Sequence, residues 1–351
     1  MMRKIVYLFL LFSLFLGAGG FLLHAFWKKN DAIYIAAGLF VGPFGEKGNR
    51  KIQPLCGYYL PDLFRPYHLR VKAPKSYKYD KLKDAKKIII FDLISDHKLG
   101  SLSFQPPEKL SLFLWEPPST VPENYDTNKH KLFSKIYTWN DDLVDNKKYF
   151  KFYYPSAVQM IPNPTPFAER KLCTLVARNK TSSHPHELYS EREKVICFFE
   201  KNAPEDFDFY GEGWAKKGYK TYKGAPVTKE CLQRYKFNFA YENMHKIKGY
   251  ITEKIFESFF YGCVPIYWGA DNIESYIPAN CFIDRRKFSS NEELFACLKS
   301  ITAEEHAIYL ENIRTFLKSE KAKLFMPETF IETFKDAAGV ENHAYRIDNS
   351  N

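Results

Sequence analysis

Short, nearly uninterrupted apolar runs are spaced along the chain between amphipathic stretches. Such runs lie at 33–39, 87–93 and 109–115, a further one lies at 134–139, and residues 152–155 close the series. Apolar runs of about four to eight residues are typical of strands buried on both faces of a parallel sheet. The pattern therefore predicts an α/β architecture for the first half of the chain.

A proline-rich segment separates this half from a second series of the same kind. Residues 161–167 (IPNPTPF) contain three prolines and show no periodicity, which is typical of a linker. Beyond it we expect strands at 172–177, 207–210, 235–240 and 264–268, and helices at 187–201, 252–261, 292–301 and 304–320. Two Rossmann-like halves of this kind bind a ligand between them, at the carboxyl ends of their strands.

An uncharged run at 5–27 precedes both halves, between Arg3-Lys4 and Lys28-Lys29. A hydrocarbon core ~30 Å thick requires roughly 20 apolar residues as helix, so we expect an uncleaved signal anchor that spans a membrane. A cleaved signal peptide is the alternative, because small residues at 17–20 follow an apolar stretch. Apolar residues continue to Trp27, which favours the anchor. Basic residues at both ends leave its orientation open.

These segments give a domain plan for the 351 residues, which are enough for two domains of about 150 residues each. With 45% hydrophobic and 17% aromatic residues, both domains can bury a core. We expect the membrane segment at 1–30, the first Rossmann-like domain at 31–160, the linker at 161–168, the second Rossmann-like domain at 169–335 and a tail at 336–351.

The formal net charge of +10 allows a nucleic-acid binder or an enzyme for anionic substrates near an anionic membrane. A nucleic-acid protein concentrates Lys and Arg on one helix or tail, whereas here acidic residues are interleaved with the basic ones. The distribution disfavours nucleic acid as a partner. The seven cysteines form no CxxC pair and no spacing typical of metal ligands.

The segment at 235–283 carries the most informative pattern. The strand expected at 235–240 delivers Glu242 and Asn243 into a loop, and Thr252 is a plausible N-cap with Glu253 and Lys254 in the first helical turn. A Lys there is unfavourable to the helix dipole unless an anion docks at the helix start, where free N–H groups and the ammonium can hold a diphosphate. A solvated helix end is the alternative.

This segment resembles the α-1,3-fucosyltransferase family. The matching pieces are F-x-x-x-x-E-N at 237–243, Y-x-T-E-K at 250–254, V-P-I-Y-x-G at 264–269 and P-x-x-C-F-I at 278–283, in which Cys281 replaces the usual serine. A weaker match extends over about 85–335. The resemblance implies a GT-B fold, two Rossmann-like domains facing a cleft, with the donor bound by residues 169–335 and the acceptor by residues 31–160.

Carried over by position, the resemblance implies that Asn243, Tyr250, Glu253 and Lys254 bind the donor, with Lys254 on the diphosphate and Glu253 facing the ribose or fucose. Arg192, in the helix after the strand at 172–177, is similar to the family's donor-binding arginine. Its planar fork suits two phosphate oxygens. A surface residue in a charged helix start is the alternative for Arg192.

Glu116 follows the strand at 109–115 and precedes two prolines, and it resembles the family's acidic residue beside the cleft. Transfer with inversion requires a base for the acceptor hydroxyl proton, so we predict that Glu116 is this base. Its pKa should not lie far above the ordinary value, because the base must be ionised when substrate binds. An ordinary loop carboxylate is the alternative. Asp141-Asp142 resemble an acidic family segment, or form a solvated turn.

The resemblance implies transfer of fucose from GDP-β-L-fucose to a hydroxyl of a glycan acceptor, as an α-1,3 linkage. No cofactor is expected besides this donor. Asp206-Phe207-Asp208 matches a D-x-D metal motif only superficially, because it lies in a strand-like alternation, so we expect no metal.

Two alternatives remain open: another GDP-sugar as donor, or an inactive, membrane-tethered glycan-binding protein. The presence of Glu116, Glu253 and Lys254 together argues against loss of catalysis. The run at 5–27 predicts a single-pass membrane protein. Its location would be the Golgi, as a type II protein, in a eukaryote, and otherwise a host membrane or cell envelope.

Overall fold

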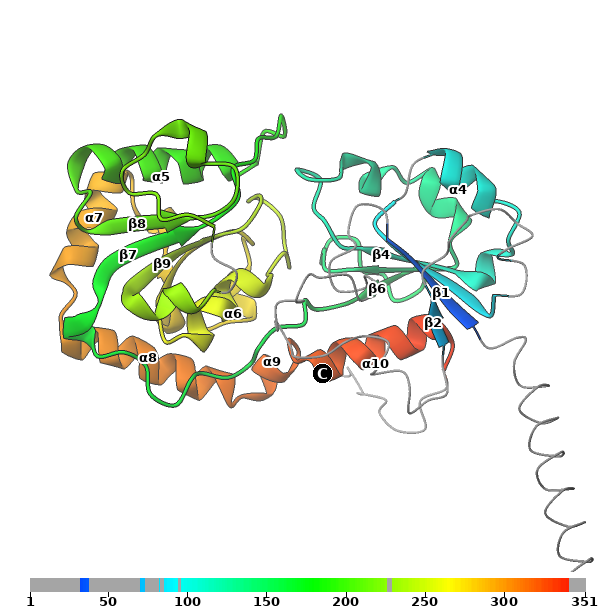
Figure 1. Cartoon of the computed structure of the whole chain (residues 1–351). Helices are drawn as coiled ribbons and strands as arrows, with labels where there is room; N and C mark the ends of the chain where they lie inside the picture. Colours follow the sequence, from blue (N-terminus) through cyan, green and yellow to red (C-terminus); the bar gives the residue numbers. More distant parts are fainter. Residues whose placement is uncertain are drawn as a thin grey trace, which may run out of the picture.

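The computed structural model describes residues 32–37, 70–72, 82, 85–93, 96–225 and 229–340. These residues form two α/β domains, each built on one sheet (Figure 1). The first sheet has six strands in the order β2-β1-β3-β4-β5-β6, and the second has five in the order β11-β10-β9-β7-β8. Every pairing between these described strands is parallel. The predicted α/β fold with parallel sheets is confirmed.

The first sheet contains the predicted strands and two further short ones. Its strands are β1 (Ala32–Ala37), β2 (Arg70–Lys72), β3 (Lys87–Phe91), β4 (Leu110–Leu114), β5 (Lys135–Thr138) and β6 (Tyr149–Lys151), and α4 (Asp96–Leu102) connects β3 to β4. All five residues of β4 are buried, which explains its uninterrupted apolar run. The segment at 152–155 follows β6 instead of forming a strand, and β2 and β6 are too short to give a sequence signal.

The second domain also follows the predicted order of elements. Its strands are β7 (Lys171–Val176), β8 (Phe207–Tyr210), β9 (Tyr235–Tyr241), β10 (Val264–Trp268) and β11 (Ile283–Asp284), and its helices are α5 (Tyr189–Asn202), α6 (Glu253–Phe260), α7 (Asn291–Ser300), α8 (Ala303–Leu317) and α9 (Glu320–Lys323). The predicted helix at 304–320 ends earlier, at Leu317, because Ser319 caps the separate helix α9. β9 lies between β7 and β10 in the centre of the sheet, so its carboxyl end lies at the middle of the edge at which these parallel strands end.

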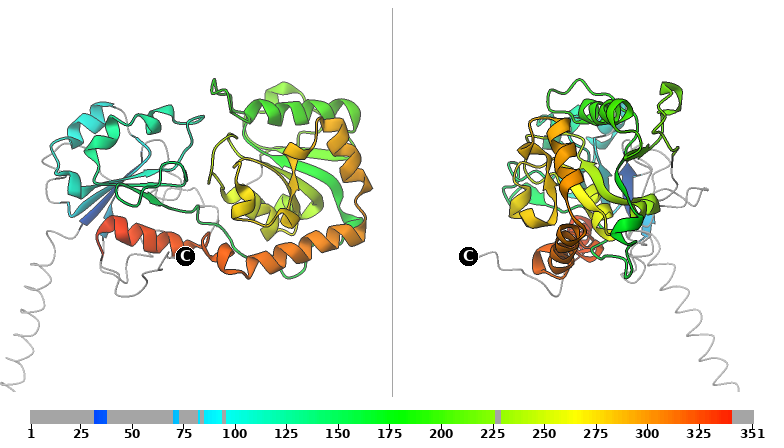
Figure 2. Two further views of the ribbon diagram at one scale, coloured as in Figure 1. Left: turned by 180° about the vertical axis from the view of Figure 1, so that it is seen from behind. Right: turned by 90° about the vertical axis from the view of Figure 1, so that its left-hand side faces the viewer.

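The last described helix returns to the first domain. After α8 and α9 run beneath the second domain, α10 (Pro327–Ala338) lies under the first sheet in both views (Figures 1 and 2). Phe330 and Phe334 pack against Phe113 of β4, and Asp336 accepts a hydrogen bond from Lys135 at 2.7 Å. The plan that places 169–335 in the second domain therefore needs correction. The apolar side of α10 packs on one face of the first sheet and buries residues of β3, β4 and β5 there.

The predicted membrane run at 5–27 lies outside the described residues. Within the described part of the chain, no helix combines the length and apolar character needed to cross a bilayer.

Candidate functional site

A cavity of about 470 Å³ lies at the carboxyl ends of β7, β8 and β9, where the second domain meets the loop after β4. Charged side chains dominate its wall. Five are cations and four are carboxylates: Arg178, Lys180, Arg192, Lys229 and Lys254, and Glu116, Glu212, Glu253 and Glu257. The predicted residues Glu116, Arg192, Asn243, Glu253 and Lys254 all line it. A site of this charge and size suits a phosphorylated ligand with further polar groups.

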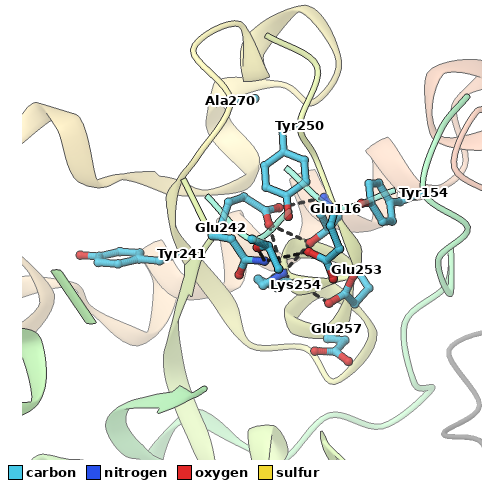
Figure 3. Close-up of polar contacts among 12 residues, drawn as sticks. Glu116, Tyr154, Tyr241, Glu242, Tyr250, Glu253, Lys254, Glu257 and Ala270 are labelled. Carbon is cyan, nitrogen blue, oxygen red and sulfur yellow. Dashed lines mark hydrogen bonds and ion pairs between the residues drawn. The ribbon is translucent and has the colours of Figure 1, made fainter. Parts of the chain in front are cut away.

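The start of α6 supplies one part of the cavity wall. Thr252 is the residue before the helix, as predicted, and Glu253 and Lys254 form its first turn. The Lys254 ammonium lies 3.2 Å from Glu242 Oε2 and 3.4 Å from Glu253 Oε1 (Figure 3). It also donates a hydrogen bond to Thr252 Oγ1 at 2.9 Å. The two carboxylates offset the unfavourable position of a cation at a helix start.

Glu242 is the functional residue that sequence reasoning did not select. It is fully buried at the end of β9, and its carboxylate accepts from both the backbone N–H and the hydroxyl of Thr252, each at 2.8 Å. Burial raises the pKa of Glu242, while Lys254 lowers it. Burial alone would lower the pKa of Lys254, but Glu242 and Glu253 outweigh it and raise the pKa. Lys254 therefore stays charged. The E-N pair of the family motif was the available signal for Glu242.

Arg192 is buried in α5, so the alternative of a surface residue is wrong. Its Nη2 donates to the backbone oxygens of Tyr241 and Glu242 at 2.8 and 2.7 Å, and to Asn243 Oδ1 at 3.1 Å. Arg192 thus fixes the end of β9 while its side chain still lines the cavity. These bonds give Arg192 a structural task that the donor-binding prediction did not include.

Asn243 joins the two domains at the cavity. Its Nδ2 donates to Glu116 Oε2 at 3.4 Å and to Thr120 Oγ1 at 3.5 Å, and both acceptors belong to the first domain. Its Oδ1 accepts from Arg192. One side chain therefore connects the predicted base with the predicted donor residues.

Tyr250 is not among the described residues that line the cavity. It is buried, and its ring packs against Trp139 at a centroid distance of 4.5 Å and against Tyr154 at 6.1 Å. In this structure Tyr250 belongs to the core of the first domain, although it lies in the sequence of the second.

Glu116 extends from the loop after β4 and is only 7% exposed. The N–H groups of Trp115 and Glu116 both donate to Asp92 Oδ1, at 2.8 and 2.9 Å, which fixes the backbone of this loop. Asn124 Nδ2 donates to the same oxygen. Burial raises the pKa of Glu116, while the cations Lys254 and Lys180 lower it. The cavity desolvates this carboxylate, so its pKa lies above the ordinary value; that the rise is small stays a prediction.

Asp92, at the end of β3, supports Glu116 from below and was not selected from the sequence. It is fully buried, has a left-handed backbone with φ of 59°, and its Oδ2 has no partner among the described residues. Desolvation raises the pKa of Asp92 to about 7. Because Oδ2 accepts no hydrogen bond from the described residues, the burial of this oxygen is not compensated. Desolvation therefore outweighs the hydrogen bonds to Oδ1 that lower the pKa.

Asp92→Asn should therefore stabilise the fold at neutral pH while keeping the Oδ1 contacts. Between pH 3.8 and about 7 the unfolded chain ionises Asp92 before the folded chain does, so the stability of the wild type falls relative to the variant as pH rises. Above pH 7 the variant should be more stable by roughly 2–4 kcal/mol, and near pH 4 the two should be equal. Denaturant unfolding of both proteins at pH 4 and pH 8 measures this. A constant difference across that range would contradict it.

Asp141 and Asp142 lie apart from the cavity wall, where they tie the domains together. Asp141 accepts from Lys151 at 2.5 Å, from Asn272 at 2.8 Å and from Tyr276 at 2.7 Å. Asp142 pairs with Lys248 at 2.8 Å. Burial would raise the pKa of Asp141, but Lys151 and these hydrogen bonds lower it. For Asp141 the alternative of a solvated turn is therefore wrong.

The D-x-D sequence at 206–208 is occupied by structural contacts. Asp206 pairs with Lys299 at 3.1 Å, and Asp208 pairs with Lys171 at 2.9 Å. Asp208 also accepts from Tyr235 at 2.8 Å. Across the described residues, no group of three or more His, Cys, Asp or Glu side chains is arranged to hold a metal ion.

Two α/β domains with parallel sheets meet at a cavity rich in cations, and this fold is similar to that of solved glycosyltransferases. The crystal structure of an α1,3-fucosyltransferase superposes with a TM-score of 0.50 at 14% identity, covering 90% of this chain and 92% of that one. An α-glucosyltransferase in complex with UDP and DNA superposes with a TM-score of 0.56 at 11% identity, covering 87% of this chain and 99% of that one. At these identities the likeness concerns the fold alone.

Residues 168–315 match the model of the glycosyltransferase family 10 (fucosyltransferase) C-terminal domain. An alpha-(1,4)-fucosyltransferase of Arabidopsis thaliana is 41% identical over 71 residues, 20% of this chain and 18% of that protein. The 4-galactosyl-N-acetylglucosaminide 3-alpha-L-fucosyltransferase 9 of Bos taurus is 31% identical over 140 residues, which are 39% of this chain and 34% of that protein. The chain thus spans only a fifth to a third of the length of these relatives. The predicted family resemblance is confirmed.

Proposed function

We propose that this protein is an inverting glycosyltransferase that moves fucose from GDP-β-L-fucose to a hydroxyl of a glycan acceptor, with an α-1,3 linkage as the expected product. The contact of Glu116 Oε2 with Asn243 Nδ2 at 3.4 Å carries this proposal. It places a desolvated carboxylate of one domain against the cationic cavity of the other. A glycan-binding protein without activity does not need this juxtaposition.

In the proposed reaction Glu116 accepts the proton of the acceptor hydroxyl as its oxygen attacks C1 of the fucose. The bond between C1 and the β-phosphate oxygen breaks on the opposite face, which inverts the configuration, and GDP leaves with the electron pair. Lys254 and Arg192 stabilise the developing charge on the diphosphate. Glu253, at the start of α6, can accept hydrogen bonds from ribose or fucose hydroxyls. No step requires a metal ion.

A donor screen tests the proposal. The full chain in detergent is incubated with GDP-fucose, GDP-mannose or UDP-glucose and a galactosyl-N-acetylglucosaminide acceptor, and GDP or UDP release and the glycan product are measured. Release and transfer with GDP-fucose alone, unchanged by EDTA, are expected. Transfer from GDP-mannose would favour the alternative in which another GDP-sugar is the donor. Binding of the acceptor glycan without any turnover would favour an inactive glycan-binding protein. Strong inhibition by EDTA would contradict metal-independent transfer.

We also propose that the run at 5–27 anchors the protein as a single-pass membrane protein, since its length and lack of charge suit a bilayer span. The full chain should sediment with membranes and stay there after alkaline carbonate washing. A chain starting near Asp31 should be recovered in the supernatant. Mass spectrometry of the amino terminus provides the control, because a mature chain that begins after Gly20 would mean a cleaved signal peptide.

A further inference from the structure

Most cations of the cavity are already paired with carboxylates. Lys254 has Glu242 and Glu253 at 3.2 and 3.4 Å. Lys229 lies 3.3 Å from Glu257. These ammonium groups bring little net positive charge to the cavity, although each keeps its ability to donate hydrogen bonds.

The two arginines of the wall are also engaged. Arg178 forms an ion pair with Glu212, and Arg192 donates to two backbone oxygens and to Asn243. The Arg192 bonds are to neutral groups, so its charge is not cancelled. A donor diphosphate carries at least two negative charges, and Arg192 alone does not balance them.

Lys180 differs from these four cations. It lines the cavity, and none of the described residues forms an ion pair or a side-chain hydrogen bond with its ammonium. The groups whose charges act on it are Glu116, Arg178, Lys254 and Arg192, all of them on the cavity wall. Lys180 therefore shares the cavity with the predicted base and the predicted diphosphate residues.

The loop that carries Lys180 is fixed on both sides of this residue. Asn179 donates through its backbone N–H to the oxygen of Glu212 at 2.9 Å, and through Nδ2 to Gly213 at 3.1 Å. Ser182 Oγ donates to the backbone oxygen of Ser119, in the first domain, at 2.7 Å. A lysine held between these two anchors stays near the junction of the domains, so little additional ordering is needed when an anion binds.

We infer that Lys180 is a binding residue for the diphosphate of the donor, supplying with Arg192 the net positive charge that the paired Lys254 does not. This inference rests on the proposed nucleotide-sugar function. Lys180, Glu116 and Lys254 line the same cavity, so this cation shares the donor site with the predicted base and the predicted diphosphate residue. The charge that develops on the leaving oxygen would thus meet an ammonium with no competing carboxylate partner.

The test compares ligand binding by the full chain and three variants, measured by calorimetry at low and moderate salt. Lys180→Met removes the charge and keeps the apolar stem, Lys180→Arg keeps the charge, and Lys216→Met removes an exposed charge outside the cavity wall. GDP affinity should fall about 10-fold or more in Lys180→Met, as for loss of one charge-assisted contact, with a weaker dependence on salt. Lys180→Arg and Lys216→Met should stay within about threefold of the wild type.

Guanosine and UDP separate this inference from the proposed donor. Guanosine carries no phosphate, so its affinity should be the same in all four proteins. If the wild type prefers UDP to GDP and Lys180→Met loses UDP affinity, the inference stands and the guanine donor is wrong. Equal GDP affinity in the wild type and Lys180→Met overturns the inference and leaves the donor intact. An unchanged GDP affinity with a raised acceptor KM would assign Lys180 to the acceptor and also overturn it.

Discussion

Replacing Glu116 by Gln should reduce fucose transfer ~100-fold or more, because the amide keeps the shape of the side chain but takes no proton. The amide oxygen can still accept the hydrogen bond that Asn243 Nδ2 donates at 3.4 Å, so the contact between the domains is retained. GDP affinity should therefore stay close to that of the wild type. Measuring transfer and GDP binding on one folded preparation tests both halves of this prediction.

The pH profile gives an independent readout. The base works in its ionised form, so kcat/KM falls as pH decreases through its pKa. Burial raises the pKa of Glu116, which places this acidic limb above the range of an ordinary glutamate. The limb should disappear or move in Glu116→Gln.

Glu123→Gln is the matched control, since Glu123 is an exposed carboxylate in the same connection after β4. It should leave both transfer and the pH profile unchanged. If Glu116→Gln keeps more than about a third of the activity, Glu116 is not the base. Glu253 would then be the next carboxylate on the cavity wall, because Asp141 is held by Lys151 and Tyr276 away from it.

Replacing Lys254 by Met should weaken GDP binding and the fold together. Loss of a charge-assisted phosphate contact costs on the order of 1.5–3 kcal/mol in binding. The fully buried Glu242 also loses its cation. Removing one partner of a buried pair costs roughly 3–5 kcal/mol, and about 2 kcal/mol is expected here because Lys254 is 24% exposed. Calorimetry with GDP and denaturant unfolding measure the two effects.

A double variant separates them. Glu242→Gln with Lys254→Met removes both charges of the pair that includes the fully buried Glu242, so it should recover most of the lost stability without recovering GDP affinity. Lys248→Met is the control, because its pair with Asp142 is exposed on both sides and contributes about 0–1 kcal/mol. Wild-type GDP affinity in Lys254→Met would remove Lys254 from the donor site.

The parts of this site that the sequence predicted are those that local sequence determines. The start of α6 at Glu253 after Thr252 depends on a few adjacent residues, and the motif around it places Asn243 and Lys254 at one end of β9. The strand before Glu116 was predicted because an uninterrupted apolar run is typical of a strand buried on both faces. Glu116 was then located by its position at the strand end.

The contacts that the sequence did not indicate join residues far apart along the chain. Asp92 supports Glu116 from 24 positions away, and Asn243 reaches Glu116 across 127 positions. In the sequence Lys180 does not differ from other loop lysines. Only the structure shows that, among the described residues, carboxylates pair with the other lysines of the cavity wall and not with Lys180. No local pattern encodes such contacts, because they depend on how strands from different parts of the chain are ordered in the sheets.

The sequence by itself indicated the two α/β halves, the proline-rich connection between them, the resemblance of the second half to the fucosyltransferases and the strand ends that carry the candidate site residues. The tertiary structure decided that α10 closes the first domain, that Tyr250 is buried in its core and that Glu242 pairs with Lys254. Hydrophobic periodicity indicates which face of its own strand or helix a residue occupies. Charge pairing and desolvation depend on which residues the fold brings within a few ångströms of one another.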